Sequence, residues 1–96
     1  MFYLYNDFAI GLQKKHYKIK SLEESIEIAP ISTAAAEIFG MLKAELEKEG
    51  IRLDDFDLVL ATCALAHNLT LVTNNTKHFE RIAGLKLENW TVDEQM

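Results

Sequence analysis

The sequence predicts an α/β domain built on a parallel sheet, because helical and strand-like patterns alternate along its second half. A helix with one apolar stripe is predicted from Thr33 to Gly50, and a second helix, apolar nearly all round, over residues 56–67. Residues 69–73 follow at once and are rich in β-formers, which indicates a buried strand. Ligands bind such sheets at the carboxyl ends of the strands, so functional residues are expected there.

The remaining elements follow from shorter patterns. Residues 2–5 favour a strand, residues 7–13 a helix, and the alternation over 25–28 a strand that ends near Pro30. Ser32 or Thr33 is suited to cap the striped helix, and Gly50 to end it. Asn74 and Asn75 make a turn. A short helix is expected over 76–82 and a last strand over 85–90, broken from each other at Gly84.

Size and charge limit the classes of function. The chain has 96 residues, enough for one domain, and a net charge of −5. Such a charge argues against non-specific nucleic-acid binding, but not against an acidic metal site that acts on phosphodiesters. The basic run of Lys14, Lys15, Lys18 and Lys20 is either a solvated surface or an edge that contacts phosphate.

No features of a secreted or membrane protein are visible. There is no apolar run of ~20 residues and no signal-peptide pattern at the start. Cys63 is the single cysteine, so no internal disulfide can form, and we expect a reducing, cytoplasmic compartment. Cys63 itself is expected to be a small core residue, and Trp90 to pack at the last strand.

Three aspartates crowd the start of the second helix: Asp54, Asp55 and Asp57. One interpretation is structural, with one aspartate capping the helix and the others favouring its positive end. The other is a site for Mg²⁺ or Mn²⁺, because three carboxylates within four residues repel one another unless a cation lies between them. Asp7, alone among apolar residues, either caps its own helix or faces this group.

Polar residues also follow the buried strand. Thr73, Asn74 and Asn75 are either a plain turn or contacts to substrate at the edge that holds Asp57. The three histidines lack the i, i+4 spacing of a metal site, and we expect surface or capping roles for them (His16, His67 and His78).

The stretch from Gly50 to Thr62, GIRLDDFDLVLAT, resembles a segment typical of PIN domains, in particular of VapC-type toxins. The similarity continues through residues 64–75, 77–82 and 84–90, and the helix before it fits as well, so residues ~31–90 are covered. This resemblance implies a parallel sheet flanked by helices on both faces. It implies metal-dependent endoribonuclease activity with Mg²⁺ or Mn²⁺, an RNA substrate, an antitoxin that blocks the site, and a homodimer.

The resemblance also assigns roles to residues. Asp57 matches the third acidic position of the family, Asp55 an auxiliary one, and Asn75 lies near the fourth. Asp7, four residues before Gly11, takes the second position. Metal ligation is therefore expected from Asp57, Asp55 and Asp7, catalysis from Asp57, Asp7 and Asn75, and RNA contacts from Thr73, Asn74, Lys14 and Lys15.

The first acidic position of the family has no match. Either the usual opening strand-helix segment is missing, or Tyr5 stands where the aspartate should be. We therefore expect residues 1–96 to form a single truncated PIN-like domain in which Phe2–Tyr5 fills the place of the central strand, within the chain or by exchange between protomers. Cleavage by the chain alone should be weak or absent. The alternative is an inactive module that binds an antitoxin or a related PIN protomer.

Overall fold

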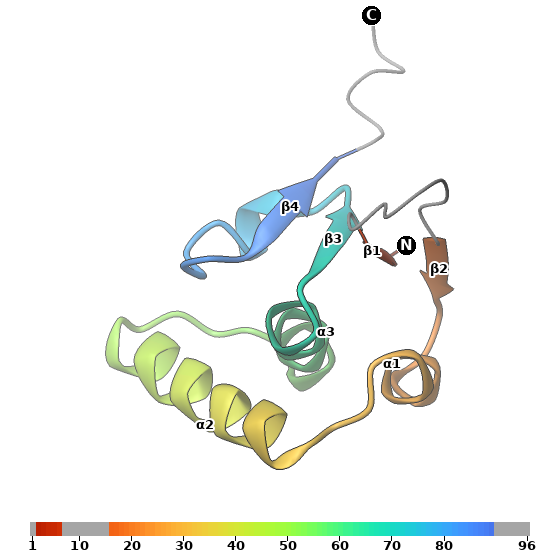
Figure 1. The fold of residues 1–96 in the computed structure, drawn as a ribbon. Helices are drawn as coiled ribbons and strands as arrows, with labels where there is room; N and C mark the ends of the chain where they lie inside the picture. The colour runs from red at the N-terminus through yellow and green to blue at the C-terminus, as the bar shows by residue number, and fades with distance from the viewer. Residues whose placement is uncertain (1, 7–15, 90–96) are drawn as a thin grey trace, which may run out of the picture.

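The computed structural model describes residues 2–6 and 16–89. Within these ranges a four-stranded sheet packs against three α-helices, which confirms the α/β class (Figure 1). The elements in chain order are β1 (Phe2–Asn6), β2 (His16–Ile19), α1 (Leu22–Ile28), α2 (Thr33–Lys48), α3 (Asp55–Ala66), β3 (Leu69–Thr73), the 3₁₀ helix η1 (Thr76–His78) and β4 (Lys86–Glu88).

The sheet is mixed rather than parallel throughout, because two of its three strand pairings are antiparallel. The strand order is β2-β1-β3-β4; only β3 and β4 run parallel, and β1 is antiparallel to both of its neighbours. The strands β1 and β2 form an antiparallel pair, and such a pair needs no crossover helix between its strands. Because β1 lies between β2 and β3, Phe2–Asn6 occupies an interior position of the sheet within one chain, as one form of the hypothesis requires.

The three α-helices α1, α2 and α3 lie on one side of the sheet, whereas helices on both faces were expected (Figure 1). The helix α3 lies between α1 and α2 and packs on β3, which explains why its sequence is apolar nearly all round. Leu60, Ala61 and Cys63 of this helix are fully buried, as is Leu71 of β3. Cys63 is thus the small core residue that the sequence predicted.

The predicted strand over 25–28 is wrong, because these residues belong to α1. Ser21 caps this helix with its side-chain oxygen, which accepts a hydrogen bond from the Glu24 amide at 3.3 Å. Ser25 is buried and donates its hydroxyl to the Leu22 carbonyl at 2.7 Å. Four alternating residues are too few to distinguish the two-residue period of a strand from the 3.6-residue period of a helix. The cap at Ser21 is the local signal that favours the helix.

The boundaries of α2 follow the predicted signals closely. Ser32 is the N-cap and accepts from the Ala35 amide at 3.2 Å. At the other end Gly50 has φ +75°, and the Ile51 amide donates to the Leu46 carbonyl at 2.8 Å. This pattern, with a second bond from the Gly50 amide to Glu47, is a Schellman motif, which satisfies carbonyls that a helix end otherwise leaves open.

Replacing this N-cap tests how much α2 depends on it. Ser32→Ala removes the acceptor for the Ala35 amide, and we expect the free energy of unfolding to fall by about 1 kcal/mol. Urea denaturation followed by circular dichroism measures the change, and Thr33→Ala serves as the control one position inside the helix. Equal loss in both variants would contradict the assignment of Ser32 as the cap.

The last part of the chain is less regular than predicted. Instead of a helix over 76–82, one turn of 3₁₀ helix forms at η1, and β4 covers only Lys86–Glu88 of the expected 85–90. The predicted helix over 7–13 and the packing of Trp90 lie outside the described residues. No helix in ranges 2–6 and 16–89 has the length and apolar character to cross a membrane.

Candidate metal and RNA site

The carboxyl end of β3 and the start of α3 bring the predicted polar residues to one place. We call this group the acidic edge and define it as Asp54, Asp57, Thr73, Asn75 and His78. Asp57 is partly buried in the first turn of α3. Burial raises the pKa of its carboxyl above the ordinary 3.8, the Asp54 carboxylate raises it further, and the charge of His78 partly lowers it. The charges of two other residues therefore act directly on Asp57.

Asp54 does not play the capping role that the structural interpretation gave to this cluster. It stands at the N-cap of α3 with extended backbone angles, but its side chain makes no capping hydrogen bond. Its carboxylate instead raises the pKa of Asp57 by repulsion. Two carboxylates that repel each other while neither caps the helix are an arrangement that a bound cation would stabilise.

A short hydrogen-bond network forms the other half of the acidic edge. Thr73 is buried, and its hydroxyl oxygen accepts from the Asn75 amide at 3.1 Å. The side chains of Asn75 and His78 meet at 2.9 Å between Nδ2 and Nδ1. Because the Nδ2 amide group can only donate, Nδ1 of His78 accepts in this contact, which fixes the orientation of the ring. Thr73 is therefore engaged in shaping the turn, while Asn74 and Asn75 are exposed.

Aromatic packing holds the two halves of the acidic edge together. Phe2 of β1 meets Phe56 of α3 with ring centroids 5.7 Å apart and Phe79 with centroids 6.3 Å apart, both edge to face. Phe56 directly precedes Asp57, and Phe79 directly follows His78. The register between β1 and β3, with Phe2 opposite Thr73, places Phe2 at this end of the sheet.

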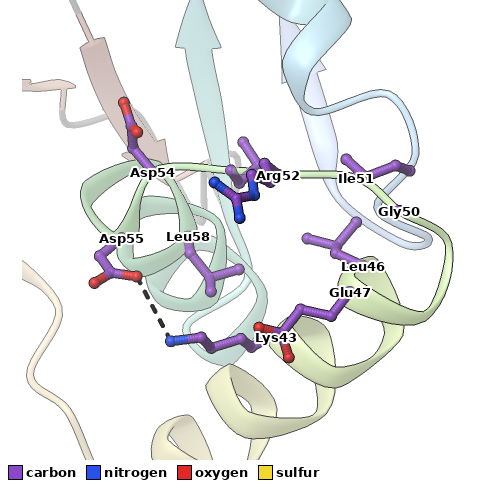
Figure 2. Close-up of a pocket in the computed structure, with 10 residues that line it drawn as sticks. Lys43, Leu46, Glu47, Gly50, Ile51, Arg52, Asp54, Asp55 and Leu58 are labelled. Carbon is purple, nitrogen blue, oxygen red and sulfur yellow. Dashed lines mark ion pairs between the residues drawn. The ribbon is translucent and has the colours of Figure 1, made fainter.

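Asp55 lies apart from the acidic edge, although it was predicted as an auxiliary metal ligand. Its Oδ1 lies 3.9 Å from Lys43 Nζ of α2, and Figure 2 shows the two side chains reaching toward each other. The Asp54 side chain points away from them in the same view. Neighbouring residues of a helix start project in different directions, which sequence spacing alone did not resolve.

The other predicted residues are not placed. Asp7, Lys14 and Lys15 lie outside the described residues. In ranges 2–6 and 16–89 no group of three or more acidic, histidine or cysteine side chains could hold a metal ion. The described part of the acidic edge thus supplies a pair of carboxylates, Asp54 and Asp57.

A comparison with protein families decides the lineage. The PIN domain family model matches residues 4–85. The chain belongs to the PIN domain family. Its match begins in β1 and ends just before β4, so the acidic edge of this PIN domain lies wholly inside it.

Characterised relatives share this domain. It is 40% identical over 78 residues to Ribonuclease VapC2 of Rickettsia felis, covering 81% of this chain and 58% of the relative. It is 37% identical over 73 residues to the tRNA(fMet)-specific endonuclease VapC of Shigella flexneri, covering 76% of this chain and 55% of that enzyme. The PIN domain therefore spans just over half the length of these two relatives.

A solved structure agrees with the fold. The crystal structure of VapBC2 from Rickettsia felis, bound to a DNA fragment from their promoter, matches with a TM-score of 0.58 and 47% sequence identity. The match covers 62% of this chain and 44% of that one. The resemblance to PIN domains found in the sequence is therefore confirmed.

Sequence reasoning missed one member of the acidic edge, His78, to which it gave only a surface or capping role. Asp54 was one of the three aspartates considered as a metal site, but the family resemblance did not assign it as a ligand. The spacing of Asn75 and His78, three residues apart in a turn, was the available signal, because side chains at i and i+3 of a 3₁₀ turn lie above one another.

Proposed function

We propose that this PIN domain is a metal-dependent endoribonuclease of the VapC type, with the acidic edge as its site. The observation that carries the proposal is the pair of Asp54 and Asp57, in which burial and repulsion raise the pKa of Asp57. A partly buried carboxylate beside a second carboxylate is an arrangement found at functional sites. The names of the relatives, a ribonuclease and a tRNA(fMet)-specific endonuclease, support RNA as the substrate.

The described donors fit Mg²⁺ or Mn²⁺ in chemical type. These hard cations take oxygen ligands, commonly one or two carboxylates with several waters. Asp57 and Asp54 would supply the carboxylates, and Asp7 and Asp55 stay ligands that the family resemblance implies. A bound cation supplies an activated water and stabilises charge on the phosphate. The protein's own contribution is to hold Asp57 through α3 and to fix His78 and Asn75 beside it.

Cleavage by this chain is expected to be weak. A complete site needs its ligands fixed in one geometry, and the described residues bring two carboxylates together rather than three. Asn75 is then best suited to contact substrate, along with Asn74, while Lys14 and Lys15 are proposed phosphate contacts. We further propose that the protein works in the cytoplasm and as a homodimer.

The second candidate is a module that binds an antitoxin or a related PIN protomer without cutting RNA. The lack of a three-ligand group among residues 2–6 and 16–89 favours it. The solved neighbour is a VapBC2 assembly, and this supports an antitoxin as the partner. The two candidates differ in one measurable property, which is affinity for Mn²⁺.

Calorimetric titration with Mn²⁺, followed by an RNA cleavage assay, separates them. For the ribonuclease we expect saturable binding of Mn²⁺ that Asp54→Asn weakens about tenfold, together with slow RNA cleavage that EDTA stops. Asp55→Asn tests the geometry, because its carboxylate lies at Lys43 and its loss should change Mn²⁺ affinity less than loss of Asp54. Tight antitoxin binding with no Mn²⁺ affinity would select the second candidate instead.

A further inference from the structure

A cavity of about 610 Å³ opens between the second half of α2, the loop over residues 50–54 and the first turn of α3 (Figure 2). We call it the α2–α3 cavity. Its volume is in the range of pockets that hold small ligands. Of its lining residues, the proposed metal site involves only Asp54 and Asp55, at one end of the cavity.

Apolar residues line only part of the cavity. Leu46 and Leu58 are almost fully buried and lie beneath it, and Ile51 packs over the end of α2. Small-ligand sites combine apolar side chains with a few polar groups that fix the ligand's orientation. A nucleobase, a flat heteroaromatic ring, is such a ligand.

Two cations, Lys43 and Arg52, lie on the walls of the cavity. Lys43 has an ion pair with Asp55 of 3.9 Å, in which the two side chains are 49% and 80% exposed, so solvent screens it strongly. Arg52 has no ion pair with any carboxylate of the described residues. Figure 2 shows its guanidinium extending from the loop over the cavity. A guanidinium can stack on a base or bind a phosphate with two hydrogen bonds.

Three carboxylates share the walls with these cations, namely Glu47, Asp54 and Asp55. Because acids outnumber bases, the cavity does not favour a small, highly charged anion such as free phosphate. A nucleotide can contact both the positive and the negative side chains of the walls. Its phosphate meets the cations, and its ring N–H and amino groups donate to carboxylates.

The position of the cavity gives it a place in the proposed reaction. Asp54 lines the cavity and also acts on Asp57, so the cavity adjoins the acidic edge. We propose that the α2–α3 cavity holds one unstacked nucleotide of single-stranded RNA, next to the phosphodiester that the acidic edge cuts. The position next to the cleaved phosphodiester rests on the proposed function. Binding of a nucleotide is inferred from the cavity alone.

The test measures binding without cleavage. A labelled 12-residue single-stranded RNA of mixed sequence is titrated with the full chain in EDTA, and fluorescence anisotropy reports the Kd at several salt concentrations. Arg52→Gln is expected to raise the Kd about tenfold and to reduce the salt dependence by about one phosphate contact. Lys48→Gln is the matched control, since this exposed lysine is on α2 but outside the cavity. Equal effects of the two variants, or no RNA binding by the wild type, would overturn the proposal.

A second measurement separates a nucleotide from other ligands. In NMR titrations with AMP, CMP, GMP and UMP, we expect the backbone amides of residues 46–58 to shift, and at least one nucleotide to shift them more than inorganic phosphate does. Equal shifts with phosphate would show that no base is bound and would overturn the proposal. So would an Arg52→Gln variant that binds RNA normally but loses an antitoxin. RNA binding that depends on Arg52 without any cleavage in Mn²⁺ would refute the ribonuclease and keep the nucleotide site.

Discussion

Asp57→Asn is expected to abolish metal-dependent cleavage while making the folded chain more stable at neutral pH. Activity should fall at least about 100-fold, because even residues outside the ligand set of a metal site cost 10–100-fold when they are replaced. Asparagine keeps the shape of the side chain and removes its charge. The repulsion from Asp54 and the desolvation of a partly buried carboxylate both disappear.

The pH dependence follows from the direction of the pKa shift. The pKa of Asp57 is higher in the folded chain than its ordinary 3.8, so the folded state binds this proton more tightly than the unfolded state. The stability that Asp57 contributes is fully present below the unfolded pKa and is lost as pH rises through the folded pKa. Wild type and Asp57→Asn should therefore be closest in stability below the ordinary pKa of 3.8, diverge as pH rises toward the folded pKa, and differ by a constant amount above it.

Thermal unfolding across pH 3–7.5, with and without Mn²⁺, measures this effect. In EDTA at pH 7 the variant should have the higher Tm, and Mn²⁺ should raise the Tm of the wild type only, because a ligand stabilises the state that binds it. Glu80→Gln, which removes an exposed carboxylate outside the acidic edge, is the control and should leave the pH profile unchanged. A variant less stable than wild type at pH 7 would show that the ionised Asp57 stabilises the fold and that its surroundings are misassigned.

The elements that were predicted correctly from the sequence are those whose hydrophobic pattern matches their burial in the fold. The stripe and caps of α2, the apolar α3 and the strand β3 were all found, because burial on one or all sides leaves a clear periodicity. The direction of β1 was not predictable. A five-residue strand pairs equally well in either direction, and only contacts such as Phe2 with Phe56 and Phe79 fix which end lies at the acidic edge.

The candidate site shows the same division. That Asp57, Thr73 and Asn75 gather at one edge follows from the rule for strand ends, and the structure brings them there. Which aspartate faces Asp57 depends on side-chain direction in the first turn of α3. The family resemblance made Asp55 the auxiliary ligand, whereas in the structure Asp54 acts on Asp57 and Asp55 lies at Lys43.

Phe79→Ala is expected to destabilise the domain more than any change at the acidic edge. Phe79 is fully buried, with 0% of its surface exposed, and is the largest of the fully buried side chains in the described residues. Truncating such a ring costs about 3–5 kcal/mol, through lost burial and the cavity left behind. A small domain has a total stability of about 5–15 kcal/mol, so we expect the Tm to fall by more than about 12 °C. Met41→Ala, at a side chain 65% exposed, is the control and should change stability by less than about 0.5 kcal/mol.

The consequence for function separates the two variants. Phe79 contacts Phe2 and directly follows His78, so its loss should loosen the acidic edge as well as the core. Mn²⁺ affinity should therefore fall in both Phe79→Ala and Asp57→Asn. The first variant should be less stable than wild type, whereas the second should be more stable at neutral pH. An osmolyte such as TMAO, which favours the folded state, should restore part of the Mn²⁺ binding of Phe79→Ala and none of that of Asp57→Asn. Full Mn²⁺ affinity in a destabilised Phe79→Ala would contradict the inference that this aromatic packing holds the site together.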